Sequence, residues 1–344
     1  MKQSMIINQG NELAYKTYRY LRVNEKKMDL GEWEFPQGEN LEEAKFLENY
    51  EYGLSSEVIE LHENHTTKYE QYNTGDFGKI KRESEEILIE TVDFIVEEGD
   101  SVQGYISTSQ KAGTFHSSLY RIHIGKNAHG KIYLANMDEK DTVSLLSLAV
   151  VLEEGATLDL YYYALCEANV AANIREYLKG EKSSGNIQAM YLAKDQQELD
   201  FLYDVMHEGK ESQSDLQVNG ALMGHAYKVF KSRLDFAQKS SGSVGNEEEY
   251  AILLDENARS LSVPALLSHE DDVEGNHAAS AGHIDSSLLF YIMSRGFSEE
   301  EAERLIIDAK FAPTIDAIEY EDIREEIYES MERILEARKN VYAS

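Results

Sequence analysis

The chain has 344 residues, and 42% of them are hydrophobic, which is enough for a sizeable core in two domains or in one elongated solenoid. Its 33 basic and 64 acidic residues give a formal net charge of -31. This charge disfavours non-specific binding to nucleic acid or to an anionic membrane, because both carry phosphate charge.

The first region, residues 1–85, is expected to be separate from the rest and mostly helical or irregular. Leu41, Ala44 and Leu47 recur at helical spacing within residues 39–50, which predicts a helix there.

From residue 86 to residue 284 the hydrophobic pattern has a period of two. Val92, Phe94 and Val96 alternate with polar residues, and similar short runs follow, bounded by Gly, Asn, Asp or Ser. No long helical pattern interrupts these runs, which argues against alternating strands and helices.

A weak repeat marks the turns of this region. Asn127-Ala128, Gly155-Ala156 and Asn257-Ala258 each precede an apolar alternation. Stacked coils need a small residue where they approach each other, so the repeat favours a solenoid. A β-sandwich would also give many short strands, and the pattern alone leaves it open.

The last region, residues 285–344, is expected to be helical. Asp285 is placed to cap the start of one helix, and Gly296 to end it. Ser298 and Glu301 form a capping-box pattern at the start of a second helix.

Pro313 is expected to break that second helix. A further amphipathic helix then has one apolar face, formed by Ile323, Ile327, Met331 and Ile334. Such faces can dock on the β-region of the same chain or on a partner, and periodicity does not separate the two.

Several functional classes lack their sequence signals. The N-terminus has no apolar signal core and the chain has no run of about 20 apolar residues, so we expect a cytoplasmic protein with no membrane partner. There is no phosphate-binding Walker motif, no G-x-S-x-G elbow and no zinc pattern, so we expect no bound nucleotide. Cys166 is the only cysteine, and one thiol cannot hold an iron–sulfur cluster, which commonly takes four thiolates.

Residues 262–302 resemble the signature of the SufB/SufD family of iron–sulfur cluster assembly proteins. The shared features are Pro264, Asp272-Val273, His277, Gly282, Ile284-Asp285, Leu289-Phe290-Tyr291 and Ser294-Arg295-Gly296. The spacing holds over about 40 residues without a gap, and fainter similarity extends over most of the chain.

The resemblance implies a mainly β fold: a right-handed parallel β-helix between a helical N-terminal region and a C-terminal helical subdomain. It also implies a non-catalytic scaffold subunit that pairs with itself or with a SufB-like paralogue. The C-terminal helices would bind a SufC-like ABC ATPase. An iron–sulfur cluster or iron would be held transiently, or only in the complex.

Two departures favour the SufD side of the family. Ile252-Leu253-Leu254 resembles a leucine run of the family, and alignment on it places Glu249 where SufB carries its functional cysteine. A carboxylate cannot accept sulfane sulfur as a thiolate does. Ala278 replaces the glutamate that follows the shared histidine in SufB.

The candidate ligands for iron or a cluster are therefore His277, and less directly Glu249, Glu274 and Asp272. Neutral imidazole suits iron, although a hydrogen-bonded structural histidine is the plain alternative. Glu249 also belongs to an acidic run that is expected to be solvated surface. Cys166 is either a small buried residue or a sulfur-handling thiol.

The alternative function is that of a parallel β-helix polysaccharide lyase or hydrolase, which would need paired carboxylates or a basic proton acceptor in a groove. Homodimer or heterodimer, cluster type, sulfur donor and recipient protein stay open at this stage.

Overall fold

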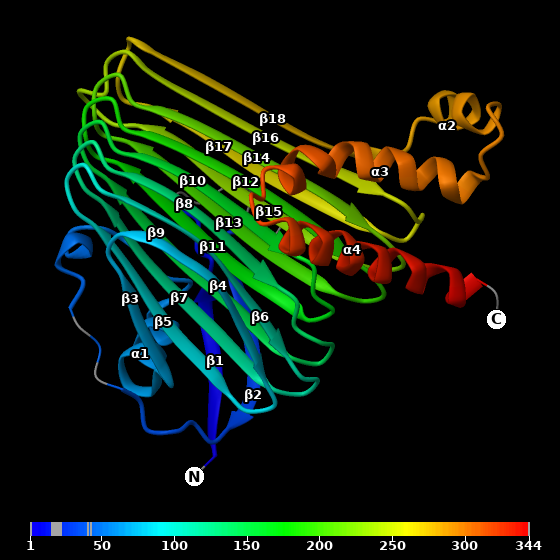
Figure 1. Cartoon of the computed structure of the whole chain (residues 1–344), viewed down its shortest axis with the longest axis horizontal. Coiled ribbons are helices and arrows are strands. Elements are labelled where there is room, and N and C mark those ends of the chain that lie inside the picture. The colour runs from blue at the N-terminus through cyan, green and yellow to red at the C-terminus, as the bar shows by residue number, and fades with distance from the viewer. Residues whose placement is uncertain (1, 15–22, 40, 42, 343–344) are drawn as a thin grey trace.

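The computed structural model describes residues 2–14, 23–39, 41 and 43–342, with side chains described as far as Glu336. Strands β3 to β18 form two eight-stranded parallel sheets that face each other (Figure 1). Odd-numbered strands form one sheet and even-numbered strands the other, so the chain crosses between sheets after every strand. This winding confirms the predicted parallel β-helix and excludes the β-sandwich.

The strands of the solenoid have these bounds: β3 Lys68–Tyr72, β4 Gly75–Ser84, β5 Leu88–Val96, β6 Ser101–Gln110, β7 Phe115–Ile124, β8 His129–Asn136, β9 Val143–Leu152, β10 Thr157–Ala164, β11 Asn169–Leu178, β12 Ser184–Ala193, β13 Glu198–His207, β14 Gln213–Leu222, β15 Tyr227–Phe236, β16 Ser243–Leu253, β17 Arg259–Ser268 and β18 Val273–His283.

Inward-facing side chains of both sheets fill the interior. The predicted alternation of Val92, Phe94 and Val96 is confirmed, since all three are buried in this core. Ladders of like residues run along the solenoid axis because parallel strands pair in register; Phe94, for example, lies beside Ile122 of β7.

The repeated turns stack at the corners, as the sequence predicts. Asn127 and Gly155 both adopt positive φ, at 54° and 65°. The positive φ of Gly155 favours glycine, and a Cβ there would also press on the Asn127 side chain. Ala128 and Ala156, which follow them, are fully buried where successive coils meet.

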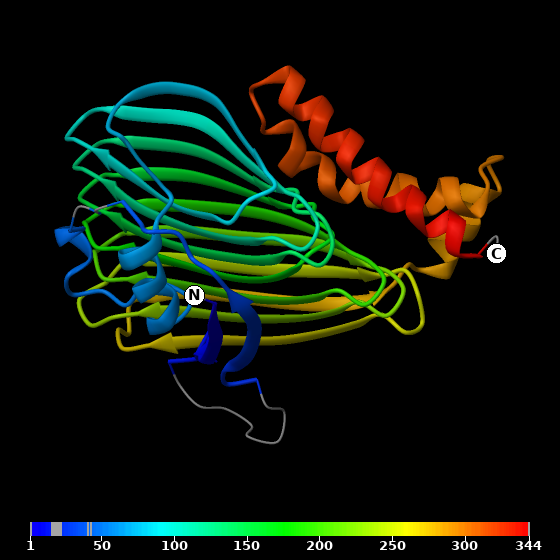
Figure 2. The same ribbon diagram turned by 90° about the horizontal axis from the view of Figure 1, so that it is seen from below.

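The N-terminal region covers the outer face of the odd-numbered sheet (Figure 2). It comprises the antiparallel pair β1 (Gln3–Gly10) and β2 (Lys26–Trp33), a short 3-10 turn η2 (Lys45–Leu47) and α1 (Ser56–His65). Residues 1–85 were expected to be mostly helical or irregular. The region instead contains strands, and the solenoid already begins at Lys68.

The predicted helix over residues 39–50 is wrong where the structure describes it, since only η2 forms there; residues 40 and 42 lie outside the described residues. Leu47 packs against Ala149 and Tyr177 of the sheet. One turn is enough to make this contact, and short isolated helices have little stability of their own.

The C-terminal region forms three helices, as expected: α2 (Ser286–Met293), α3 (Glu299–Asp316) and α4 (Glu321–Tyr342). Asp285 caps α2 and the Ser298–Glu301 capping box is present. Pro313 does not break α3, which continues for three more residues. Proline lacks an N–H donor and its ring presses on the carbonyl four residues earlier. Burial of Phe311, Thr314 and Ile315 holds the last turn of α3 in place around it.

Helices α3 and α4 pack on the outer face of the even-numbered sheet (Figures 1 and 2). The predicted apolar face of α4 is fully buried there: Ile323, Ile327, Met331 and Ile334. This face therefore docks on the chain's own β-region. No helix in the described part of the chain is long and apolar enough to cross a membrane.

The two ends of the solenoid differ. At the N-terminal end the rings of Tyr72, Phe77 and Phe94 stack inside the first coil and fill it. At the C-terminal end β17 and β18 are the last strands of their sheets, so each has one unpaired edge. The inward side chains of β18 are exposed from His277 to His283, whereas most of those of β17 are half-buried.

Candidate functional site

The candidate site lies at the open C-terminal end, where the inward face of the solenoid changes from apolar to polar. Strand β16 directs Glu247 and Glu249 inward, and His277 on β18 lies in register with Glu247. Neighbouring Cα atoms of adjacent strands stand about 4.8 Å apart. The structure thus places two of the predicted residues, His277 and Glu249, on the inward face. Glu247, which was not predicted, lies on the same face, in register with His277 and two residues before Glu249.

Glu249 is fully buried, which corrects the expectation of a solvated acidic run. The Lys228 ammonium of β15 lies 2.6 Å from its Oε1, and Tyr191 donates to the same oxygen at 3.1 Å. Ser262 donates to Oε2 at 2.8 Å. Both oxygens are engaged, so Glu249 acts as an anchor inside the solenoid.

Lys228 is as deeply buried as its partner. Burial lowers the pKa of its ammonium, and the Glu249 carboxylate opposes that shift. A buried charge needs such a partner, because transfer from water into the interior is costly.

Glu247 is also buried, with 3% of its surface exposed, but it has no cation partner among the described residues. Its Oε1 accepts a hydrogen bond from Ser232. Burial raises the pKa of this carboxyl to about 7, Ser232 opposes the shift and the nearby Glu249 adds to it. Only Glu248, between the two, faces solvent.

The other predicted carboxylates lie away from this face. Glu274 is exposed on the outer face of β18, where its Oε1 lies 3.5 Å from the Asn276 amide. Asp272 lies in the turn before β18, where its Oδ2 accepts a hydrogen bond from Ser241 at 2.7 Å. Neither shares the inward face with His277.

Cys166 is buried in the corner between β10 and β11, and its thiol points to the Ala168 carbonyl at 3.8 Å. Burial raises the pKa of this thiol far above its usual value. Since the thiolate is the reactive form, this environment disfavours sulfur chemistry at Cys166.

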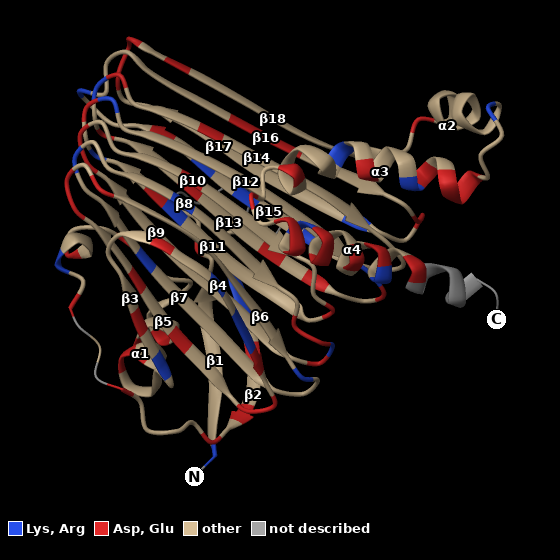
Figure 3. Cartoon of the chain, viewed as in Figure 1, with Lys and Arg blue, Asp and Glu red and all other residues tan. Residues whose placement is uncertain are grey.

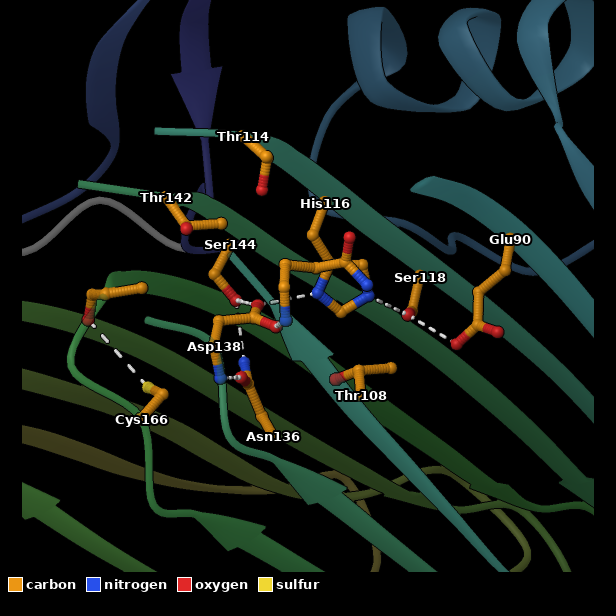
Figure 4. Close-up of polar contacts among 12 residues, drawn as sticks. Glu90, Thr108, Thr114, His116, Ser118, Asn136, Asp138, Thr142, Ser144 and Cys166 are labelled. Atoms are coloured by element: carbon orange, nitrogen blue, oxygen red, sulfur yellow. Dashed lines mark hydrogen bonds and ion pairs between the residues drawn. The ribbon is translucent and has the colours of Figure 1, made fainter. Parts of the chain in front are cut away.

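A second buried polar cluster lies in the first coils (Figure 4). His116 Nδ1 lies 2.7 Å from Asp138 Oδ2, and its Nε2 lies 2.7 Å from Ser118 Oγ. Ser118 donates its proton to Glu90 at 2.8 Å, so the imidazole donates to Ser118 through Nε2 and to Asp138 through Nδ1. Burial opposes protonation of His116, but the two carboxylates outweigh it and its pKa is raised.

This cluster has the residue types of a serine hydrolase triad without its geometry. The Ser118 hydroxyl is directed to Glu90 rather than to the histidine, so the histidine cannot act as its base. His116 and Ser118 are only 3% and 2% exposed, which leaves no access for a substrate. Its carboxylates, Glu90 and Asp138, are fully buried rather than in a groove, so the cluster gives no support to the polysaccharide lyase or hydrolase alternative either.

No group of three or more His, Cys, Asp or Glu residues in the described part of the chain is arranged to hold a metal ion. The open end offers two neighbouring donors, His277 and Glu247. An iron–sulfur cluster, as cargo, would need further ligands from elsewhere.

The family-motif residues beyond β18 shape the start of the helical subdomain. Gly296 has a φ of 102°, which ends the first helical segment as predicted. Arg295 lies over the Tyr291 ring at 4.8 Å and donates to its hydroxyl at 2.8 Å. Ser294 caps the end of α2. Pro264 and Gly282 lie on β17 and β18 of the last coil.

The helical subdomain carries an unusual surface. Several large apolar side chains on α2, in the turn after it and on α3 are exposed: Leu288, Phe290, Tyr291, Met293, Phe297 and Leu305. Beside them lies a groove of about 720 Å³ between α3, α4 and the turn after β16, lined by Asp255, Glu299, Glu300, Glu301, Glu303, Glu332 and Glu336 among others. Acidic residues along both helices are visible in Figure 3.

Sequence reasoning missed Glu247 and Lys228. Glu247 shares the two-residue spacing of Glu249 and so had to face the same side of β16. Lys228 gave no signal, because its partner is 21 residues away and on the other sheet.

The match to a known family model covers most of the solenoid. Residues 79–310 match the family model described as the SUF system iron–sulfur cluster assembly SufBD core domain. The chain is 31% identical over 156 residues to the iron–sulfur cluster assembly protein SufD of Bacillus subtilis, covering 45% of this chain and 36% of that protein.

Two further relatives are SufBD family proteins. One from Mycobacterium leprae is 22% identical over 244 residues, covering 70% of this chain and 27% of the relative. One from Staphylococcus epidermidis is 23% identical over 242 residues, covering 70% and 50%. The chain thus spans at most about half the length of these relatives. With the core-domain match, these similarities show that the chain belongs to the SufB/SufD family of iron–sulfur cluster assembly proteins and is SufD-like.

Proposed function

We propose that this chain is a non-catalytic, cytoplasmic scaffold subunit of a SUF-type iron–sulfur cluster assembly complex. The observation that carries the proposal is the open C-terminal end of the solenoid. There His277 is exposed beside two unpaired strand edges, β17 and β18. An unpaired edge is a ready template for another chain.

A second subunit pairs along this end. Strand β18 carries small residues on both faces (Ala278, Ala279, Ser280 and Ala281), which let another backbone approach closely. The only cysteine is buried in the corner that follows β10, and β10 lies four strands from β18 in the same sheet, about 19 Å at the usual strand spacing. Thiolate ligands therefore come from a different chain, which favours a SufB-like paralogue over a second copy.

The exposed apolar side chains of α2 form the docking surface for a SufC-like ABC ATPase. Phe290 and Tyr291 are 73% and 55% exposed, in contrast to the buried face of α4. Large aromatic side chains at this level of exposure are typical of interface anchors.

The experiment is co-expression with the ATPase of the same cell, followed by anaerobic affinity capture and sizing. A stable stoichiometric complex supports the scaffold class. If the well-folded chain captures no ATPase, the scaffold proposal is contradicted and the polysaccharide lyase or hydrolase alternative has to be considered again. An assay of activity on polyuronides would then test that alternative.

Phe290→Asp is expected to reduce ATPase capture at least tenfold, because loss of a buried aromatic anchor costs about 2 kcal/mol or more. Capture yield at fixed bait concentration measures the change. Ile6→Asp is the matched control, since Ile6 is an exposed apolar residue on β1, far along the chain. Equal losses in both variants would mean that α2 is not the docking surface.

His277→Ala is expected to abolish cluster formation in the assembled complex, because it removes the imidazole donor from the proposed site. Folding is expected to be unchanged, because the exposed imidazole makes no hydrogen bond within the described part of the chain. Absorbance of the reconstituted cluster and the thermal unfolding midpoint measure the two effects. His283→Ala, on the same strand, is the control. Normal cluster formation in His277→Ala would remove His277 from the site.

A further inference from the structure

A small cavity lies inside the first coils of the solenoid, beside the buried polar cluster around His116. Its volume is about 20 Å³, and every residue that lines it is at most 6% exposed. From the even-numbered sheet it is lined by Thr108 of β6, Asn136 of β8 and Tyr162 of β10, and from the odd-numbered sheet by His116 and Ser118 of β7, among others (Figure 4). A cavity with only apolar walls would stay dry, whereas this one has polar groups on both sides.

The Tyr162 hydroxyl at this cavity lacks a partner. Its oxygen is fully buried and makes no hydrogen bond to any described residue. Tyr162 as a whole is only 3% exposed, so bulk solvent does not satisfy the hydroxyl either. A buried hydroxyl without a partner is costly, and native proteins rarely leave one so. The hydroxyl therefore calls for a hydrogen-bonding group that the described side chains do not supply.

Two other residues that line the cavity have hydrogen-bonding capacity to spare. The Thr108 hydroxyl lies 3.5 Å from the Ala135 carbonyl oxygen, which is long for an O–H···O bond. The Asn136 Oδ1 accepts the N–H of Asp138 at 3.0 Å, and a carbonyl oxygen has a second lone pair. One small molecule between them and Tyr162 would use all three groups.

We propose that this cavity binds one water molecule as a permanent part of the fold. The water accepts a hydrogen bond from the Tyr162 hydroxyl and donates to Asn136 Oδ1 and Thr108 Oγ1, and three bonds are typical of a buried water. A volume of about 20 Å³ is enough for one water and too small for a ligand of several heavy atoms. The site does not depend on the proposed scaffold function.

The bound water joins Tyr162 to the polar cluster of the first coils. Asn136 donates to Ser144 at 2.6 Å, and Ser144 donates to Asp138 at 2.7 Å. His116 bonds the same carboxylate oxygen of Asp138 at 2.7 Å. Through the water this chain of hydrogen bonds continues to Tyr162, so that one network crosses four consecutive strands, β7 to β10, and ties the two sheets together from inside.

The test is the number of long-lived buried waters in the purified full chain, measured by magnetic relaxation dispersion of the water signal. Tyr162→Phe keeps the ring and removes the donor, and it is expected to lower that number by one. Tyr163→Phe is the matched control, because the neighbouring hydroxyl is on the opposite face of β10 and already donates to the Thr314 carbonyl at 2.8 Å. This control is expected to keep the wild-type number.

A high-resolution crystal structure of the wild type locates the same water, as one density peak within hydrogen-bond distance of the Tyr162 hydroxyl. If Tyr162→Phe does not fold, Thr108→Val takes its place: it keeps the side-chain volume, removes another partner of the water and is expected to weaken the peak. An empty cavity in the wild-type density overturns the proposal. So does an unchanged number of buried waters in a folded Tyr162→Phe variant.

Discussion

Lys228→Met is expected to lower the free energy of unfolding by about 3–5 kcal/mol, because it leaves the buried Glu249 carboxylate without its cation. Tyr191 and Ser262 still donate to that carboxylate, but neutral donors do not balance its charge. Urea unfolding followed by circular dichroism at neutral pH measures the change.

Two further variants make this prediction specific. Replacing both partners, Lys228→Met with Glu249→Met, is expected to recover most of the loss, since well-packed apolar pairs often match a buried ion pair in stability. Lys126→Met removes one partner of an exposed pair with Glu154 and is expected to leave the free energy of unfolding nearly unchanged, because solvent screens the pair. A Lys228→Met variant as stable as Lys126→Met would mean that Glu249 is not an anchor.

Glu176→Gln is expected to remove a pH-dependent loss of stability of about 3 kcal/mol between pH 4.5 and pH 7. Glu176 lies inside the solenoid on β11, and neither of its carboxyl oxygens has a hydrogen-bond partner in the described part of the chain. Gly185 makes room for it, since a Cβ there would collide with the carboxyl group.

The sign follows from the pKa. Burial raises the pKa of Glu176 from 4.5 to about 8, so the folded chain keeps the proton that the unfolded chain releases. Stability therefore falls as pH rises from 4.5 to 8 and is constant above 8 as far as this group is concerned. Glutamine resembles the neutral acid and has no such dependence.

The measurement is the difference in unfolding free energy between the variant and the wild type at pH 4.5, 7 and 8.5, which cancels the titration of other groups. The exposed Glu248→Gln is the control and is expected to give a flat difference. A flat difference for Glu176→Gln as well would show that its carboxyl ionises normally in the folded chain.

The sequence by itself determined the features that depend on local chemistry. The two-residue period of Val92, Phe94 and Val96 predicted strands, because strand side chains alternate between faces. Asp285 and the Ser298–Glu301 capping box fixed the starts of α2 and α3, because a helix start needs side-chain acceptors for its N–H groups. The family motif around His277 then predicted the solenoid.

Only the tertiary structure decided which of these residues form the site. The spacing of Glu247, Glu248 and Glu249 gives their alternation but not which side is the interior, since that depends on which face of the sheet is turned toward the opposite sheet. Burial of Glu249 depends on Lys228, which reaches it from the opposite sheet. His277 and Glu247 are 30 residues apart, one turn of the solenoid, and only the register of β16 with β18 makes them neighbours.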